Sequence, residues 1–181
     1  KKTVTVGGTS YTAPQIFINV GARPHIPDIP GLKAVPYLTS TSVIALEELP
    51  RHLIVLGGSY IGLEFAQMYR RFGAEVTVIE RGQQLAPKED ADISDAIANI
   101  LSGDGIKILM NHTLLSITKE EAGVVIRTDQ GEVRGSHVLV ALGRRPNTDD
   151  LGLDLAGIET DRHGFITVDE RLQTTAEGVW A

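Results

Sequence analysis

A glycine-rich turn at residues 57–62 carries the clearest chemistry in this sequence. It directly follows the apolar run Leu53–Leu56 and reads Gly57-Gly58-Ser59-Tyr60-Ile61-Gly62. Gly57 permits a tight turn out of a strand, and Gly62 allows the following helix to pack closely on a sheet. Free N–H groups and the helix dipole at such a turn bind phosphate. The six residues therefore predict a binding site for the pyrophosphate of a dinucleotide.

The middle glycine of the usual dinucleotide-binding pattern is replaced here by Ser59. That glycine lets the backbone approach the pyrophosphate. Either the small side chain of Ser59 fits beside the phosphates, or its hydroxyl donates a hydrogen bond to them. The strand before the turn, the helix after it and an acid further on favour a dinucleotide over a phosphate-free strand–turn–helix.

Glu80 is that acid, and it ends the second β-branched run, Glu75–Ile79. A carboxylate here accepts hydrogen bonds from the adenosine ribose and repels a 2′-phosphate, whereas an arginine accommodates one. Arg81 is adjacent, but one acid directly in place should outweigh one neighbouring base. We therefore predict NAD as the cofactor, with NADP less favoured. Gly143 follows the buried run His137–Leu142 at the sheet edge where such ligands bind.

The surrounding elements alternate strand and helix. After the turn we predict a helix over residues 60–72, a strand at 75–79, a helix capped by Asp90 or Asp92, and a strand at 106–110. This order implies a parallel sheet with right-handed crossovers. The expected buried faces are Ile61, Phe65, Met68, Tyr69 and Phe72 on the first helix and Ile93, Ile97, Ile100 and Leu101 on the second.

After Asn111 the periodicity changes to short antiparallel strands at 113–118, 124–128 and 132–134. The predicted fold class is therefore α/β, a Rossmann-like doubly wound parallel sheet in three layers, with a β-meander replacing one crossover helix. The runs Phe17–Pro24 and Val138–Pro146 share the order strand, glycine, arginine, proline. We interpret them as two crossings between this domain and a neighbour, although ordinary strand exits would have the same form.

Composition excludes several classes of function. The net charge of −6 gives no electrostatic case for nucleic acid or an anionic membrane, and the absence of cysteine excludes disulfides and thiolate metal sites within this piece. The histidines show no metal-ligand spacing, so no metal site is predicted. No membrane span or signal peptide is recognisable, which favours the cytoplasm. The chain begins at Lys1 without methionine, and we expect it to belong to a longer protein.

Taken together, these motifs resemble the flavin-dependent pyridine nucleotide-disulfide oxidoreductases, which include dihydrolipoamide dehydrogenase, glutathione reductase and mercuric reductase. The resemblance implies that residues 1–35 end a first flavin-domain segment, 36–144 form the NAD(P)-binding domain, and 145–181 start the flavin-domain return segment. Residues 164–169 and 172–175 resemble the strand that re-enters the flavin domain. FAD would be bound only by the full-length parent, a homodimer in such families.

The resemblance also gives Tyr60 and Glu64 catalytic roles. Tyr60 matches an aromatic residue that covers the flavin ring and swings aside for nicotinamide. Glu64 matches an acid that pairs with a lysine beside the flavin, from a segment outside this chain. From the residues alone, Tyr60 could instead pack on the sheet, and Glu64 could be a solvated carboxylate favoured by the helix dipole.

Several parts of the family pattern are missing: the flavin fingerprint, the redox-active cysteine pair and the dimerisation domain. We therefore expect an NAD(H)-binding domain that presents nicotinamide for hydride transfer to FAD and is not catalytically complete alone. The parent would be an oxidoreductase acting on a disulfide, thiol or metal ion. Two alternatives stay open: a domain of a cysteine-free NADH:flavin oxidoreductase, and a non-catalytic module that senses NADH.

Overall fold

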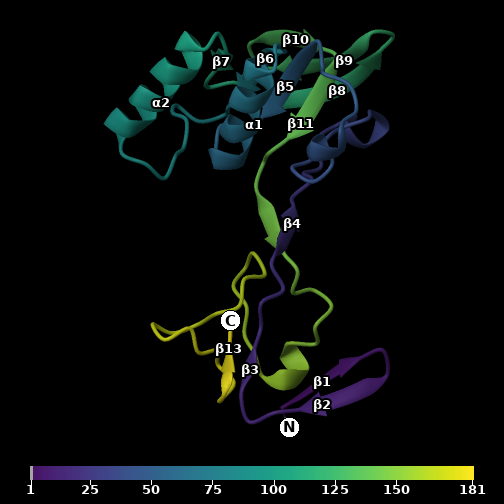
Figure 1. Ribbon diagram of the computed structural model, residues 1–181, viewed down its shortest axis with the longest axis vertical. Helices are drawn as coiled ribbons and strands as arrows, with labels where there is room; N and C mark the ends of the chain where they lie inside the picture. Colours follow the sequence, from purple (N-terminus) through teal and green to yellow (C-terminus); the bar gives the residue numbers. More distant parts are fainter. Residues whose placement is uncertain (1) are drawn as a thin grey trace. The chain divides into compact units, whose positions relative to one another are not determined.

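The computed structural model describes residues 2–181, which divide into two compact units (Figure 1). Unit 2 is the continuous segment from Pro24 to Gly143, and unit 1 combines the described residues up to Arg23 with Arg144–Ala181. Within unit 2, the N–H of His25 donates to the carbonyl oxygen of Gly143 at 3.0 Å. The two ends of unit 2 therefore lie side by side.

Unit 2 is built on a four-stranded parallel sheet with the order β11-β5-β6-β7. The strands are β5 (His52–Leu56), β6 (Glu75–Ile79), β7 (Lys107–Leu109) and β11 (His137–Val140). All are rich in β-branched and aliphatic residues, and β5 is buried from Leu53 onward. Continuous apolar runs of this kind are expected of parallel strands that are covered on both faces.

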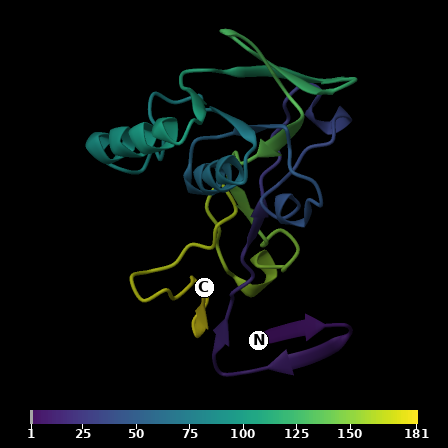
Figure 2. The same ribbon diagram turned by 45° about the horizontal axis from the view of Figure 1, so that its top comes forward.

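Both α-helices cover one face of this sheet. Helix α1 (Tyr60–Arg71) connects β5 to β6, and α2 (Ala91–Gly103) connects β6 to β7. Leu53 and Val55 share a core cluster with residues of these helices, whereas Ile54 and Leu56 belong to a cluster on the opposite face. This alternation follows from the two-residue period of a strand. Figure 2 shows the two helices on the same side of the sheet.

A three-stranded antiparallel meander covers the other face. Its strands are β8 (Leu114–Glu120), β9 (Gly123–Thr128) and β10 (Gly131–Gly135), in the order β10-β9-β8. Ile117 and Ile126 are buried in the same cluster as Ile54 and Leu56. The connector before β5 adds two short 3₁₀ helices, Leu32–Ala34 and Val43–Ala45. The predicted α/β class, with a parallel sheet and a meander in place of one crossover helix, is confirmed.

The predicted buried face of α1 is wrong in part. The buried residues are Gly62, Leu63, Ala66 and Tyr69, while Phe65 and Met68 are only partly buried. Phe72 is 62% exposed. The close approach at Gly62 turns Leu63, Ala66 and Tyr69 toward the sheet and leaves Phe72 exposed.

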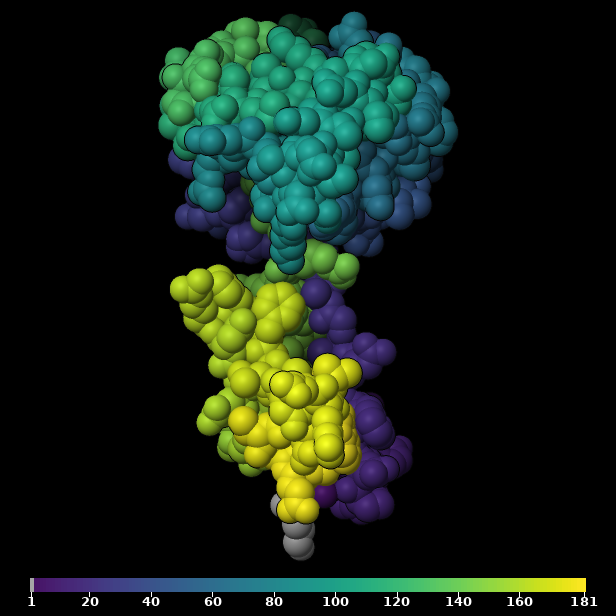
Figure 3. Space-filling view, turned by 90° about the vertical axis from the view of Figure 1, so that its left-hand side faces the viewer, coloured from purple at the N-terminus to yellow at the C-terminus, as the bar shows by residue number. Residues whose placement is uncertain are grey.

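The predicted buried face of helix α2 also differs in part from the observed one. Leu101 is buried as predicted, but Ile93 and Ile100 are exposed, and Ser94 is buried instead. The hydroxyl of Ser94 donates to the carbonyl oxygen of Leu85, which satisfies its polar group inside the core. In the space-filling view of Figure 3, the outer surface of α2 and its preceding loop is teal and faces the viewer.

Unit 1 consists of short strands and irregular chain. Its strands are β1 (Thr3–Val6), β2 (Thr9–Thr12), β3 (Ile16–Phe17), β4 (Ala22–Pro24, whose last residue belongs to unit 2), β12 (Arg144–Pro146) and β13 (Val179–Trp180), with a 3₁₀ helix at Asp154–Ala156. Strand β13 pairs in parallel with β3, and Phe17 stacks on Trp180 with ring centroids 5.3 Å apart. Residues 164–175 contribute only isolated β-bridges. No helix among residues 2–181 is long and apolar enough to cross a membrane.

Candidate functional site

The turn after β5 depends on Gly57. Its φ of +105° lies in the region that favours glycine, and its N–H donates to the carbonyl oxygen of Ile79 at 2.9 Å. A Cβ atom on Gly57 would lie 2.5 Å from the carbonyl oxygen of Ala141, just after β11. Both the backbone conformation and the lack of space therefore require glycine.

Gly62 brings the first turn of α1 against the sheet. A Cβ atom there would lie 2.3 Å from the carbonyl oxygen of Gly57, 3.2 Å from Val55 Cγ1 and 3.3 Å from Ala141 Cβ. The chain goes from β5 through α1 to β6 on one side, and it reaches β11 on the other side only after the meander. The turn thus lies at the carboxyl edge where strand order reverses, the usual ligand position of open α/β sheets.

The N-terminus of α1 has no side-chain cap. Its N-cap residue is Ser59, with extended backbone at φ −98° and ψ 174°, and its hydroxyl makes no capping hydrogen bond to any described residue. The first N–H groups of a helix have no intrahelical acceptor, so they and the helix dipole face outward. The backbone of Ser59 is one that any residue adopts, which explains why serine is tolerated where the pattern has glycine.

Glu80 lies at the end of β6 and ties two backbone segments together. Its Oε2 accepts from the N–H of Gly58 at 2.7 Å, and its Oε1 accepts from the N–H of Gly82 at 2.6 Å. A carboxylate offers about four lone-pair sites, so the half-buried Glu80 keeps acceptor capacity beyond these two bonds. Arg81 is exposed beside it.

The loop of residues 81–90 also packs on the glycine turn, which the sequence analysis did not anticipate. The N–H of Ala86 donates to the carbonyl oxygen of Gly58 at 2.7 Å. A Cβ atom on Gly58 would lie 2.7 Å from Leu85 Cδ2, and Leu85 and Ala86 are both buried. The only sequence signal for this contact was the apolar pair Leu85-Ala86 within an otherwise polar loop.

Tyr60 is the first residue of α1, and its side chain is directed to the same loop. The residue is 44% exposed, and its hydroxyl donates to Glu89 Oε1 at 2.5 Å. This hydrogen bond to a carboxylate, followed by burial, raises the pKa of the Tyr60 phenol above its ordinary value. Glu89 was not among the residues predicted from sequence.

The structure brings most of the predicted site residues together around the glycine turn, and two further predicted residues, Glu64 and Gly143, have other surroundings. Glu64 is exposed on the next turn of α1. Gly143 adopts a φ of +108°, and a Cβ atom on it would meet nothing within 4 Å. The conformation of its backbone, rather than a close neighbour, therefore requires glycine at this position.

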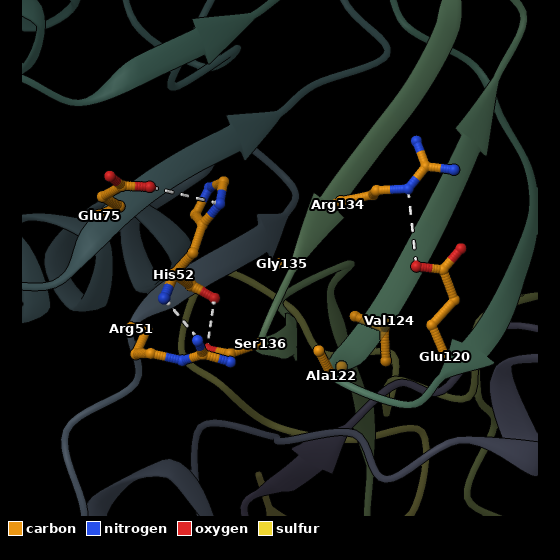
Figure 4. A pocket seen from close by; sticks show the side chains of 10 residues that line it. Arg51, His52, Glu75, Glu120, Ala122, Val124, Arg134, Gly135 and Ser136 are labelled. Carbon is orange, nitrogen blue, oxygen red and sulfur yellow. Dashed lines mark hydrogen bonds and ion pairs between the residues drawn. The ribbon is translucent and has the colours of Figure 1, made fainter.

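A separate hollow of about 420 Å³ lies at the opposite edge of the sheet (Figure 4). His52 and Glu75, which begin β5 and β6, line it together with Glu120 and Arg134 from the meander. Two contacts join these side chains: Arg134 Nε lies 3.6 Å from Glu120 Oε2, and His52 Nδ1 lies 3.8 Å from Glu75 Oε2. This hollow offers no helix N-terminus to a phosphate. No group of His, Asp and Glu in residues 2–181 has the arrangement of a metal site.

The surroundings of His52 in this hollow favour the neutral form of its imidazole. Burial lowers the pKa of its imidazole, an effect that Glu75 opposes and Lys107 reinforces. The Nε2 atom lies 2.9 Å from the hydroxyl of Thr77, which is itself buried in β6. The imidazole thus satisfies a buried hydroxyl at the base of the sheet.

Comparisons with known proteins agree with this geometry. A family model described as "Pyridine nucleotide-disulphide oxidoreductase" matches residues 1–181. The chain is 41% identical over 176 residues to a probable pyridine nucleotide-disulfide oxidoreductase, RclA, of Escherichia coli, covering 97% of this chain and 40% of that protein. It is 40% identical over 181 residues to a mercuric reductase of Streptomyces lividans, covering 97% of this chain and 38% of the relative.

Solved structures give the same picture. The flavoprotein disulfide reductase RclA of Escherichia coli superposes with a TM-score of 0.90 at 40% identity, covering 99% of this chain and 42% of that one. A water-forming NADH oxidase from Lactobacillus brevis, solved with NADH bound, gives a TM-score of 0.83 at 26% identity, covering 99% of this chain and 42% of that one. The chain therefore spans about two fifths of the length of these proteins.

Proposed function

Because this chain belongs to the pyridine nucleotide-disulphide oxidoreductase family, as its sequence motifs predicted, we propose that unit 2 binds NAD(H) at the glycine turn. In the full-length parent, the bound nicotinamide would be presented to FAD. One observation carries the proposal: Gly57 and Gly62 bring an uncapped helix N-terminus against Ala141 at the switch point of a parallel sheet. A side chain at either glycine would collide with a backbone carbonyl oxygen, of Ala141 or of Gly57, and force the turn and the helix apart.

The residues of the chain would bind and orient the cofactor. The N–H groups at residues 59–62 would bind the pyrophosphate, and the remaining lone pairs of Glu80 would accept from the adenosine ribose. Arg81 and Gly143 are the other two residues that we propose to contact the cofactor. Bound nicotinamide supplies hydride chemistry, and the protein contributes position and electrostatics.

The flanking segments have a proposed place as well. The segments of unit 1, residues up to 23 and Arg144–Ala181, would belong to the flavin domain of the parent, and unit 2 to the nicotinamide domain. Residues 24–35, assigned from the sequence to the flavin segment, lie in unit 2 instead, where Leu32 and Val35 share a core cluster with Ile54. The parallel pairing of β3 with β13 joins the two flanking segments within unit 1 and supports this assignment. Tyr60 would lie beside the flavin ring, and Glu64 would pair with a lysine from the parent. The parent would be a homodimer that passes electrons to a disulfide, thiol or metal ion.

A second candidate is the NADH-binding domain of a flavin oxidoreductase without redox cysteines. The likeness to a water-forming NADH oxidase, with a TM-score of 0.83, favours it. The two candidates differ outside this chain: a Cys-x4-Cys motif after a second glycine fingerprint in the parent gene would identify the disulfide enzyme.

Calorimetric titration of the 181-residue chain with NADH and NADPH tests the proposal. We expect NADH to bind more tightly by about 10-fold, or about 1.4 kcal/mol. Glu80→Ala should weaken NADH binding. If NADPH binds more tightly, or if the alanine variant loses no affinity, Arg81 governs the pocket instead. Absence of binding by either nucleotide would refute the proposed function.

If this chain binds only the nicotinamide nucleotide and the rest of the parent binds the flavin, the colour of the purified chain provides a test. We expect the purified chain to be colourless, because the flavin-binding elements belong to the rest of the parent. The control is the full-length parent, which should carry flavin absorbance. Stoichiometric flavin bound to the 181-residue chain would contradict the assignment of this piece.

A further inference from the structure

Ser94 is a polar residue near the start of α2 that is only 2% exposed. Its N–H makes the ordinary helical hydrogen bond to the carbonyl oxygen of Asp90 at 3.0 Å. A serine inside a helix commonly returns its hydroxyl to a carbonyl oxygen of the preceding turn. Ser94 instead donates its single hydroxyl proton to the carbonyl oxygen of Leu85, in the loop of residues 81–90. The hydroxyl therefore joins α2 to that loop.

The carbonyl group of Leu85 depends on this hydrogen bond. Leu85 is 1% exposed, so water cannot reach its carbonyl oxygen in place of the hydroxyl of Ser94. A buried acceptor that loses its donor bears the full cost of its desolvation. Removing the hydroxyl should therefore displace the loop, because the loop must move before the carbonyl group can reach water.

Leu85 and Ala86 hold Gly58 from the side of the loop. Leu85 Cδ2 would lie 2.7 Å from a Cβ atom on Gly58, so the leucine side chain packs directly against the α-carbon of this glycine. The N–H of Ala86 donates to the carbonyl oxygen of Gly58 at 2.7 Å. Ala86 has a φ of +44°, which a residue other than glycine keeps only where its surroundings impose it. The contacts to Gly58 and Ser94 are part of those surroundings.

We propose that Ser94 is a positioning residue for the glycine turn, acting through Leu85 and Ala86 on Gly58. Gly58 directly precedes Ser59, the N-cap of α1, so its orientation sets the direction of the N–H groups that follow. Those N–H groups would bind the pyrophosphate, and the inference therefore rests on the proposed function. The start of α2 in this way determines the geometry of a site at the start of α1, without a contact between Ser94 and the nucleotide.

A positioning role and a purely structural role change different quantities. A hydrogen bond that only stabilises the fold changes the fraction of folded chains, and its loss leaves the Kd of the folded chain unaltered. A bond that directs the phosphate-binding N–H groups changes that Kd, because hydrogen bonds weaken when their angle departs from the favoured range. From the net contribution of one hydrogen bond, we expect Ser94→Ala to raise the Kd for NADH about 5-fold.

Calorimetric titration of the 181-residue chain with NADH measures this change, at a temperature well below the unfolding midpoint of each variant. Thr77→Val is the matched control. Thr77 is also 2% exposed, and its hydroxyl bonds to His52 Nε2, whose residue lines the hollow at the other edge of the sheet. This variant should lose stability and keep the Kd of wild type. Ser102→Ala, exposed in the same helix as Ser94, should change neither quantity measurably.

A second measurement follows the glycine turn directly. In amide NMR spectra of the nucleotide-free chain, Ser94→Ala should shift the signals of Gly58 and Ser59, and Thr77→Val should leave them in place. Ser94→Cys keeps the size of the side chain with a weaker donor, so its Kd and its shifts should lie between those of wild type and Ser94→Ala. It also provides an independent test if the alanine variant does not fold.

The outcomes separate the two proposals. An unchanged Kd in folded Ser94→Ala, or an equal rise in Thr77→Val, would overturn the positioning role while NADH binding stands. Unmoved signals of Gly58 and Ser59 in Ser94→Ala would overturn it as well. If wild type binds neither NADH nor NADPH, the proposed function fails and the role in phosphate binding fails with it. The amide signals then still decide whether Ser94 orients the turn.

Discussion

The carboxylate of Glu80 accepts a hydrogen bond from the backbone N–H of Gly58, across a distance of 2.7 Å. The same carboxylate accepts from Gly82 at 2.6 Å. The acid that is proposed to bind the ribose is thus also part of the structure of the glycine turn. Substituting it changes the shape of the site as well as its charge.

This relationship predicts a loss of stability without any nucleotide. Glu80→Ala leaves two backbone N–H groups without their acceptor, and we expect the free energy of unfolding to fall by about 2 kcal/mol. Glu80→Gln keeps one acceptor oxygen and should lose about half as much. Urea denaturation measures both. The exposed Glu121 provides a control, since Glu121→Ala should stay within about 0.5 kcal/mol of wild type.

A second prediction concerns the close contact of α1 with the sheet. Gly62→Ala places a methyl group 2.3 Å from the carbonyl oxygen of Gly57, so the helix must shift outward. We expect a loss of about 2–3 kcal/mol in stability and a loss of NADH binding. Gly103→Ala is the matched control, because a Cβ atom there meets nothing within 4 Å. Unfolding curves in which both variants equal wild type would contradict the close approach.

Ser59 gives a prediction about the phosphate site. Ser59→Gly should keep or improve NADH affinity, because it clears the backbone and removes no capping hydrogen bond. The helix itself should lose only a few tenths of a kcal/mol. Ser59→Leu should weaken binding by about 10-fold or more by displacing a phosphate contact. A leucine variant that binds NADH as well as wild type does would place the phosphate site elsewhere.

His52 predicts how stability depends on pH. Burial lowers the pKa of the folded-state imidazole, so below about pH 6.5 the unfolded chain binds a proton that the folded chain does not. This contribution to stability is fully present above about pH 6.5 and is lost as the pH falls through the lowered folded-state pKa. Urea midpoints between about pH 5 and 7.5 should therefore fall less in His52→Gln than in wild type.

Glu75 provides a check on the sign of this effect. Its charge raises the pKa of His52, so Glu75→Gln should lower that pKa further. The acid-side loss of stability should then become larger than in wild type. Identical pH profiles for wild type and His52→Gln would show that this histidine contributes nothing to the pH dependence.

Features that depend on residues close together in the sequence, such as the glycine turn, were predicted correctly. Gly57 and Gly62 were assigned from a pattern in which a strand, a tight turn and a close helix must follow in order, and both contacts are present. The buried face of α1 was predicted only in part, because the spacing of large apolar side chains indicates Tyr69, which is buried, but also Phe72, which is exposed. The approach permitted by Gly62 instead selects Leu63 and Ala66 and leaves Phe72 at the rim.

The contacts of the loop of residues 81–90 were not predicted from the sequence. Ala86 and Glu89 bind Gly58 and Tyr60, from which α1 and β6 separate them along the chain, and no periodic pattern marks these contacts. Such contacts depend on how the loop closes in three dimensions. The loop closure therefore contributes contacts to the glycine turn that the sequence pattern does not mark.

The hydrogen bond between His25 and Gly143 has a consequence for protein engineering. Because unit 2 begins and ends at neighbouring points, a short connector from residue 24 to residue 143 would give a circularised module whose core clusters lie within that segment. Because its two ends are adjacent, the segment can also be inserted into a surface turn of another protein without separating the two residues that flank the insertion. Residues 24–143 can therefore be transferred between proteins as one continuous stretch of sequence.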